Sequence, residues 1–151
     1  MIRRYEQADL TACAAVFCAA FSAEPWNENW TDSLAETRIS ELMCSPLSVG
    51  YVYEENGEII GFAAGRNVTY LFGREYMIDE FCIRPERQGR GTGSEMLTFI
   101  AADQKRSGTV NIVLNTSKGL PSEKFYLKNG FRQAENMIFM SLNLTESYYK
   151  S

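Results

Sequence analysis

The chain has 151 residues, of which 45% are hydrophobic and 23% are charged, and its formal net charge is −4 at pH 7. This length fits one domain, residues 1–151, with a buried core of ordinary globular composition. The acidic balance and the lack of a basic stripe argue against a nucleic-acid partner.

Targeting and metal-binding patterns are missing from the sequence. The N-terminal residues are polar, unlike a signal peptide, and no apolar run reaches the roughly 18 residues of a membrane-spanning helix. The four cysteines, Cys13, Cys18, Cys44 and Cys82, form no C-x-x-C pair, and the chain has no histidine. We therefore expect a cytoplasmic protein with free thiols, no metal site and no membrane partner.

The first elements predicted in chain order are a strand, two helices and a β-hairpin. Apolar residues repeating every 3.6 positions indicate helices, and alternation indicates strands. The elements are a strand at 2–5, a helix from Asp9 or Thr11 to Phe21, a loop at 22–30, a helix from Thr31 or Asp32 to Ser45-Pro46, and strands at 49–53 and 59–66. Asn56-Gly57, between these two strands, tolerates the positive φ angles of a tight hairpin turn.

The second half alternates strands with helices. It comprises a segment without a clear pattern at 67–74, a strand at 76–83, a helix from Ser94 to Gly108, a strand at 110–114, a helix at 120–128, and a final strand or hairpin at 131–144. The order β-α-α-β-β-β-α-β-α-β predicts an α/β (α+β) fold. A single mixed sheet would be flanked by helices on both faces.

The most specific local feature is the run Arg87-Gln88-Gly89-Arg90-Gly91-Thr92-Gly93, between a buried strand and a helix. Glycines at alternate positions can turn the chain sharply and leave several backbone N–H groups pointing outward. Together with the positive end of the helix, these groups suit a pyrophosphate. A purely structural turn is the alternative, since the spacing matches neither a Walker loop nor the dinucleotide fingerprint. A pyrophosphate bound there would belong to a cofactor, so the loop indicates an enzyme.

Two motifs resemble the GNAT superfamily of acetyl-CoA-dependent N-acetyltransferases. Gln88, Gly91 and Gly93 match its Gln/Arg-x-x-Gly-x-Gly/Ala signature, and residues 124–131 resemble its Phe-Tyr-x-x-x-Gly-Phe segment. The resemblance implies the GNAT fold, in which a single mixed, mostly antiparallel sheet has a central splay. It also implies an acyltransferase that moves an acetyl group to a primary amine by direct attack in a ternary complex, without a metal.

The resemblance implies that acetyl-CoA is the co-substrate and indicates where it binds. Its pyrophosphate would lie on the glycine loop, and its pantetheine arm would enter the splay beside the strand that ends at Ile83. The residues implied in cofactor binding are Phe81, Cys82, Ile83, Gln88, Gly89, Arg90, Gly91, Thr92, Gly93 and Ser94. Gly119 stands where many members have a cofactor-contacting asparagine. Either Asn115 takes over that contact or the loop 116–119 follows a different path.

Tyr126 is expected to be the general acid that protonates the departing thiolate, on the strength of its place in the second motif. The alternative is a tyrosine that only packs against the sheet. Because the chain has no histidine, Asp79 and Glu80 are the candidates for positioning or deprotonating the amine. Alternation along the strand would place them on opposite sides of the sheet, and ion pairs with nearby arginines are the alternative role. An acyl-cysteine route through Cys82 is disfavoured because its context is apolar.

The loop before the second predicted helix lies where the family places its acceptor-binding segment. Its candidates are Glu24, Trp26 and Trp30, whose carboxylate and indoles suit a small cationic amine, aminoglycoside- or polyamine-like. Tryptophans that pin the loop to the core are the alternative.

A peptide or protein amine, N-terminal or lysine, is the second acceptor class, and a non-catalytic acyl-CoA sensor is the alternative function. The apolar tail from Met137 to Tyr149 would either add a strand across a homodimer interface or complete the sheet of its own chain.

Overall fold

A computed structural model describes residues 1–145 of the chain. The elements are β1 (Ile2–Arg4), the 3-10 turn η1 (Gln7–Asp9), α1 (Leu10–Ser22), α2 (Asp32–Leu42), β2 (Ser48–Glu55), β3 (Glu58–Tyr70), β4 (Gly73–Ile83), the 3-10 turn η2 (Pro85–Arg87), α3 (Thr92–Arg106), β5 (Thr109–Leu114) and α4 (Pro121–Lys128). The predicted order of elements is therefore confirmed as far as α4. No helix in residues 1–145 is long and apolar enough to cross a membrane.

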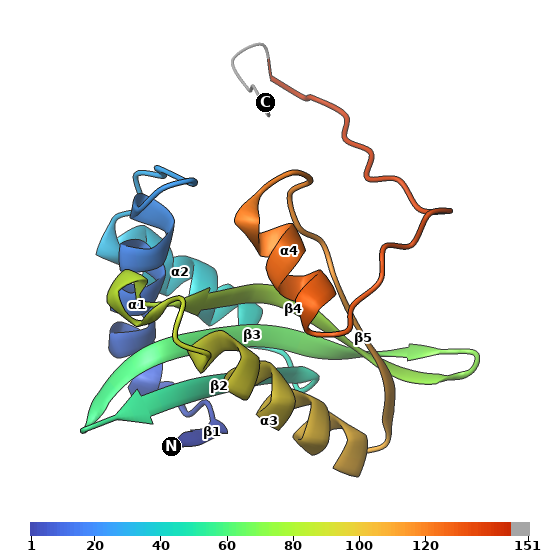
Figure 1. Cartoon of the computed structure of the whole chain (residues 1–151), viewed down its shortest axis with the longest axis horizontal. Coiled ribbons are helices and arrows are strands. Elements are labelled where there is room, and N and C mark those ends of the chain that lie inside the picture. Colours follow the sequence, from blue (N-terminus) through green and yellow to red (C-terminus); the bar gives the residue numbers. More distant parts are fainter. Residues whose placement is uncertain (146–151) are drawn as a thin grey trace.

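The strands form one sheet in the order β1-β2-β3-β4-β5. The first four are joined antiparallel, whereas β5 runs parallel to β4 because α3 carries the chain back across the sheet. Figure 1 shows this single sheet with helices on both of its faces. The mixed, mostly antiparallel α/β architecture predicted from the sequence is confirmed.

Two apolar cores lie on opposite faces of the sheet. Helices α1 and α2 cover one face, where Phe17 and Ile39 pack with Phe62 of the sheet. Helix α3 covers the other, where Met96 packs with Tyr76. The aromatic side chains of α4 pack against this second core, which fixes α4 beside the carboxyl end of β5.

The two long hairpins of the sheet differ at their turns. Asn56 (φ 51°) and Gly57 (φ 79°) form the β2–β3 turn, as predicted. The unassigned segment 67–74 continues β3 and β4 into a second hairpin, whose tip carries Leu71 and Phe72 at 89% and 91% exposure. A hairpin is usually recognised by a polar turn between two strands of alternating polarity. Here the turn is apolar and the strand residues beside it are polar, so the sequence did not predict this hairpin.

The sheet opens between β4 and β5. Pairing of the two strands ends at Ile78 and Leu114, although β4 continues to Ile83. From residue 79 to 83, β4 therefore pairs only with β3 within the described chain. This splay leaves one side of β4 open to a ligand.

The final strand or hairpin predicted for 131–144 is wrong for the described residues, which contain no strand after α4. Phe131 packs against Tyr126 at a centroid distance of 5.4 Å, and the backbone after it extends beyond α4 as an irregular segment (Figure 1), from which Phe139 lines the pocket beside β4. A strand needs a partner edge, and within residues 1–145 the sheet consists of β1 to β5 alone, so this segment adds no strand to it. The predicted tail extends to Tyr149, and its last residues lie outside the described part of the chain.

Candidate functional site

A cleft of about 700 Å³ opens at the splay. Its walls come from β4, the glycine loop, the residues after β5, helix α4, and the end of α1 with the loop that follows, and Phe139 of the segment after α4 also lines it. The cleft brings together most of the residues expected from the sequence: Glu24, Trp26, Asp79, Glu80, Phe81, Cys82, Ile83, Gln88, Gly89, Gly93, Asn115 and Tyr126. The remaining candidates, Trp30, Arg90, Gly91, Thr92 and Ser94, do not line it.

The glycine loop exposes backbone N–H groups beside the cleft. Gly89 (φ 70°) and Gly91 (φ 87°) adopt the left-handed conformation that favours glycine. The first hydrogen bond into α3 is donated by the N–H of Glu95 to the Gly91 carbonyl at 2.9 Å. The N–H groups of residues 92–94 precede this bond and lie at the positive end of the helix, where an anion is favoured.

Polar side chains hold this loop in place. Gln88 Nε2 donates to the carbonyl of Ile83 at 2.9 Å, and Thr92 Oγ1 donates to the carbonyl of Arg87 at 3.1 Å. Arg87 Nη2 also pairs with Glu55 Oε2 at 2.6 Å. The Gln88 and Thr92 side chains therefore fix the loop, and backbone N–H groups remain as the donors for a ligand.

Gly93 serves a different purpose from the other loop glycines. A Cβ atom at this position would lie 2.9 Å from Cζ of Phe125. Glycine thus allows α4 to pack closely against the start of α3, which brings Tyr126 to the splay.

A β-bulge in β4 places both acidic candidates on one face of the sheet. Ala64 of β3 pairs with Glu80 and Gly65 pairs with Ile78, so Asp79 is an extra residue in β4. The prediction that Asp79 and Glu80 face opposite sides is therefore wrong, because a bulge shifts the alternation by one residue. Both side chains lie at the α1/α2 face and line the cleft.

Each of the two carboxylates has an arginine partner. Arg38 of α2 donates to Glu80 Oε1 through Nη2 at 2.9 Å and through Nε at 3.2 Å. Arg66 Nε lies 3.6 Å from Asp79 Oδ2, a weaker contact. The ion pairs proposed as an alternative role are present, but they coexist with exposure to the cleft.

Burial raises the pKa of Glu80, and the bonds from Arg38 oppose that rise. Glu28 and Asp79 add negative charge nearby, which also raises the pKa. Two close carboxylates in a partly desolvated cleft form a site that a cationic ligand would stabilise.

Tyr126 lies in an aromatic cluster at the other side of the cleft. Its ring centroid is 5.2 Å from that of Phe125, 5.4 Å from Phe131 and 6.2 Å from Phe81. Burial raises the pKa of the phenol well above its usual value, and Cys82 and Glu80 add to the effect. The phenol is therefore protonated at neutral pH and able to donate its proton.

Cys82 also borders the cleft but is only 5% exposed. Burial raises the pKa of its thiol well above the ordinary value, which keeps it protonated. A protonated thiol is a poor nucleophile, so the geometry argues against an acyl-cysteine.

Trp30 is a correction to the predicted acceptor-binding set. Its ring packs edge-on against Phe17 at a centroid distance of 4.7 Å, and its indole N–H donates to Glu28 Oε2 at 3.1 Å. The loop turns back through Asn27, whose φ is 50°, so the two tryptophans occupy different environments. Trp26 lines the cleft, while Trp30 pins the loop to the α1/α2 core.

Sequence reasoning left one lining residue open and missed the partner of a lining carboxylate. Asn115 lines the cleft at the end of β5, whereas the N–H of Gly119 donates to Glu123 Oε2 at 2.5 Å. Arg38 was not foreseen as part of the site. The available signal was its place one turn after Ala35, a fully buried residue of α2.

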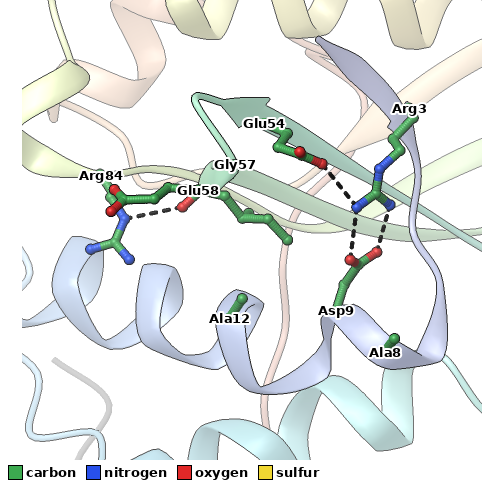
Figure 2. A pocket seen from close by; sticks show the side chains of 9 residues that line it. Arg3, Ala8, Asp9, Ala12, Glu54, Gly57, Glu58 and Arg84 are labelled. Carbon is green, nitrogen blue, oxygen red and sulfur yellow. Dashed lines mark hydrogen bonds and ion pairs between the residues drawn. The ribbon is translucent and has the colours of Figure 1, made fainter.

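A second cavity, of about 530 Å³, lies between the β2–β3 turn and the start of α1 (Figure 2). Arg3 donates to both oxygens of Asp9, at 2.8 and 2.9 Å, and to Glu54 at 3.2 Å. On its other side, Arg84 Nε donates to the carbonyl of Ile59 at 3.1 Å. These bonds join β1, the first turn and the hairpin, so we assign them a structural role.

Replacing Asp9 by Asn is expected to lower the free energy of unfolding at pH 7 by about 2 kcal/mol, because a largely buried charged pair is broken. The bonds from Arg3 lower the pKa of Asp9. Its stabilising contribution is therefore present above the unfolded pKa and is lost as the pH falls through the lower folded value.

Urea unfolding across a pH series measures this difference. Glu58→Gln, at an exposed carboxylate beside the same cavity, is the matched control and should change little. Equal effects of the two variants would contradict the assigned role.

The sequence matches the family model described as an acetyltransferase (GNAT) domain over residues 46–133. The chain belongs to the GNAT acetyltransferase family. The matched region runs from just before β2 to just after α4 and so contains the splay, the glycine loop and Tyr126. The acyltransferase assignment made from the sequence is confirmed at this level. No curated protein matches the sequence.

Solved structures show the same fold at low identity. A GNAT family acetyltransferase from Staphylococcus aureus is 15% identical, with a TM-score of 0.74 and coverage of 94% of this chain and 98% of that one. The aminoglycoside N-acetyltransferase AAC(6')-Iy in complex with CoA is 18% identical, with a TM-score of 0.74 and coverage of 94% and 93%. An aminoglycoside acetyltransferase from an uncultured soil metagenome, in complex with sisomicin, is 15% identical, with a TM-score of 0.77 and 96% coverage of both chains.

Proposed function

We propose that this GNAT enzyme transfers an acetyl group from acetyl-CoA to the primary amine of a small cationic molecule. The observation that carries the proposal is a single cleft that joins the glycine loop and the open side of β4 to Tyr126 and two carboxylates. The proposal places the acetyl donor and the amine side by side in this cleft.

The cofactor half of the proposal depends on the loop and the splay. The free N–H groups at the start of α3 suit the pyrophosphate of coenzyme A. The unpaired side of β4, residues 79–83, offers backbone groups to the amide-containing pantetheine arm, which would bind like an added strand. This arrangement would bring the thioester near the bulge at Asp79.

The chemistry requires one bond to form and one to break. The neutral amine nitrogen attacks the thioester carbon, the carbon–sulfur bond breaks, and the phenol of Tyr126 gives its proton to the departing thiolate. The nitrogen, cationic after the attack, releases a proton to solvent as the amide forms, and solvent returns a proton to the Tyr126 phenolate. A carboxylate beside the amine, for which Glu80 is our choice, holds the cationic substrate and receives its proton directly or through water. Direct attack in a ternary complex agrees with the protonated state of the Cys82 thiol.

The acceptor half depends on charge and shape. Asp79, Glu80 and Glu24 contribute carboxylates to the cleft, and Trp26 adds an aromatic face suited to a cation. The similar solved structures include aminoglycoside acetyltransferases, one of them in complex with sisomicin. These features favour a compact polyamine-like or aminoglycoside-like acceptor over a peptide.

Titration calorimetry of acetyl-CoA tests the cofactor site. Gly91→Glu should weaken binding by about tenfold, because its carboxylate opposes the anion at the positive end of α3. Gly108→Glu is a matched control, since Gly108 also has a positive φ (84°) and open space around a Cβ, but lies just beyond the other end of α3. It should bind acetyl-CoA like the wild type.

Release of free coenzyme A in the presence of an amine panel then tests catalysis. Equal binding by the wild type and Gly108→Glu, with binding weakened by about tenfold in a folded Gly91→Glu, would support the site. Absence of binding by the wild type would overturn it. Binding without release above background for any amine would instead support an acyl-CoA sensor.

A further inference from the structure

The wall of the cleft that faces the open side of β4 carries polar side chains in place of a paired strand. The chain beyond β5 no longer pairs with β4. Asn115, Thr116 and Ser117 follow directly after β5, and Ser122 comes from the first turn of α4. All four line the same cleft as residues 79–83 of β4. A ligand in the splay therefore has a strand backbone on one side and amide and hydroxyl groups on the other.

Two of these side chains form a hydroxyl pair. Thr116 Oγ1 donates to Ser122 Oγ at 2.8 Å, which joins the loop after β5 to α4. Each hydroxyl carries one hydrogen, and this bond uses one of the two. The other, on Ser122, has no acceptor among residues 1–145 and is available to a ligand. Ser122 lies four residues before Tyr126, so both side chains line the cleft from the same side of α4.

Asn115 is a further donor on this wall. Its side chain makes no hydrogen bond with any other of residues 1–145, although it lines the cleft. A primary amide has two N–H donors and a carbonyl acceptor. Asn115 can therefore bind either the N–H or the C=O group of an amide in a ligand.

The loop between β5 and α4 is held in place without a ligand. The Thr116–Ser122 bond fixes it at one point, and the N–H of Gly119 donates to Glu123 Oε2 at a second. Gly119 has a φ of 82°, which lets the chain turn back toward α4. Groups that are already positioned lose little freedom when a ligand binds, so their hydrogen bonds contribute more to affinity.

The geometry of an amide indicates which ligand this wall suits. In a trans amide the N–H and C=O groups point in opposite directions. If an extended arm bonds to the open side of β4 through one of these groups, it turns the other toward residues 115–122. The pantetheine arm of coenzyme A is extended and contains secondary amides, so its outer edge needs polar partners of this kind.

We propose that Asn115 and the Thr116–Ser122 hydroxyl pair bind the outer edge of the pantetheine arm, where a paired strand would otherwise lie. This inference rests on the proposed function, because the arm enters the splay only if coenzyme A is the co-substrate. Thr116 and Ser122 are new contact residues, which the sequence did not single out. Their role is to bind and position the arm, one helical turn before the phenol of Tyr126.

Titration calorimetry with two ligands tests this assignment. Ser122→Ala should weaken coenzyme A binding by about threefold to tenfold, the loss expected for one neutral hydrogen bond, and Asn115→Ala should do the same. Neither change should alter the affinity for the nucleotide fragment of coenzyme A, which keeps the pyrophosphate but lacks the pantetheine arm. The fragment is measured by displacement of coenzyme A, so that weak binding is also detected.

Two further variants sharpen the comparison. Thr116→Val should weaken coenzyme A binding, and Thr116→Val combined with Ser122→Ala should weaken it no more than Ser122→Ala alone, because the two hydroxyls act as a pair. Ser33→Ala is the matched control, since Ser33 is the second residue of α2 as Ser122 is of α4, but does not line the cleft. It should bind both ligands like the wild type.

The outcomes separate this assignment from the proposed function. Wild-type affinity for coenzyme A in Ser122→Ala and Asn115→Ala overturns the assignment, while weakened binding by Gly91→Glu would still support the cofactor site. Equal weakening of both ligands also overturns it, because these residues would then only shape the loop. A wild type that binds neither ligand overturns the proposed function and this assignment together.

Discussion

Replacing Tyr126 by Phe is expected to lower kcat by about 10²- to 10⁴-fold, the usual contribution of a positioned proton donor. The ring would keep its contacts with Phe81, Phe125 and Phe131, so the fold of α4 should survive. The affinity for acetyl-CoA should stay within a few-fold of wild type, because the phenol acts on the departing sulfur. Steady-state kinetics with a reactive amine, together with calorimetry of acetyl-CoA, separates the two quantities.

The control for this change is Tyr70→Phe, which removes the same hydroxyl group from an exposed residue at the β3–β4 tip. It should leave kcat unchanged. If Tyr126→Phe retained wild-type kcat, Tyr126 would be a packing residue, and another donor or water would protonate the thiolate. A fall in acetyl-CoA affinity alone would indicate a cofactor contact instead.

Replacing Glu80 by Gln is expected to lower kcat/KM for a cationic amine by roughly 10- to 100-fold, since a hydrogen bond to a charged group contributes about 1.5–3 kcal/mol. Glutamine keeps the size of the side chain but removes the charge that would face the amine. Acetyl-CoA binding should not change. Glu41→Gln on the exposed part of α2 is the matched control and should behave like the wild type. A larger loss in Asp79→Asn than in Glu80→Gln would transfer the role to Asp79.

The pH dependence of kcat/KM is a second test of the role of Glu80. Burial raises its pKa, so the acidic limb of kcat/KM should lie at higher pH than an ordinary glutamate would give. Activity then falls as the pH drops through that raised value, and Glu80→Gln should remove the limb. Arg38→Met removes the bonds that lower this pKa and should move the limb to still higher pH. An unchanged profile in both variants would contradict an ionised Glu80 at the acceptor.

The features that were predicted correctly from the sequence depend on residues that are close together in the chain. Asn56-Gly57 requires a tight turn because of its permitted φ angles, and the glycine run before α3 requires a sharp turn for the same reason. The motif around Tyr126 lies on one short helix, α4, and the turn that follows it, so its presence and position followed from the sequence. These features depend on local backbone preferences, which a short stretch of sequence contains.

Contacts between distant elements decided what the sequence left open. The bulge at Asp79 exists only in the pairing of β4 with β3, and it placed Asp79 and Glu80 on the same face where alternation predicted opposite faces. Arg38 contacts Glu80 because α2 packs over that face of the sheet. Trp30 does not line the cleft because its ring packs against Phe17. The segment 137–144 has the sequence of a strand, yet a strand also needs a neighbouring edge. Hydrogen-bond partners and side-chain neighbours are properties of the assembled fold, so only the tertiary structure could determine them.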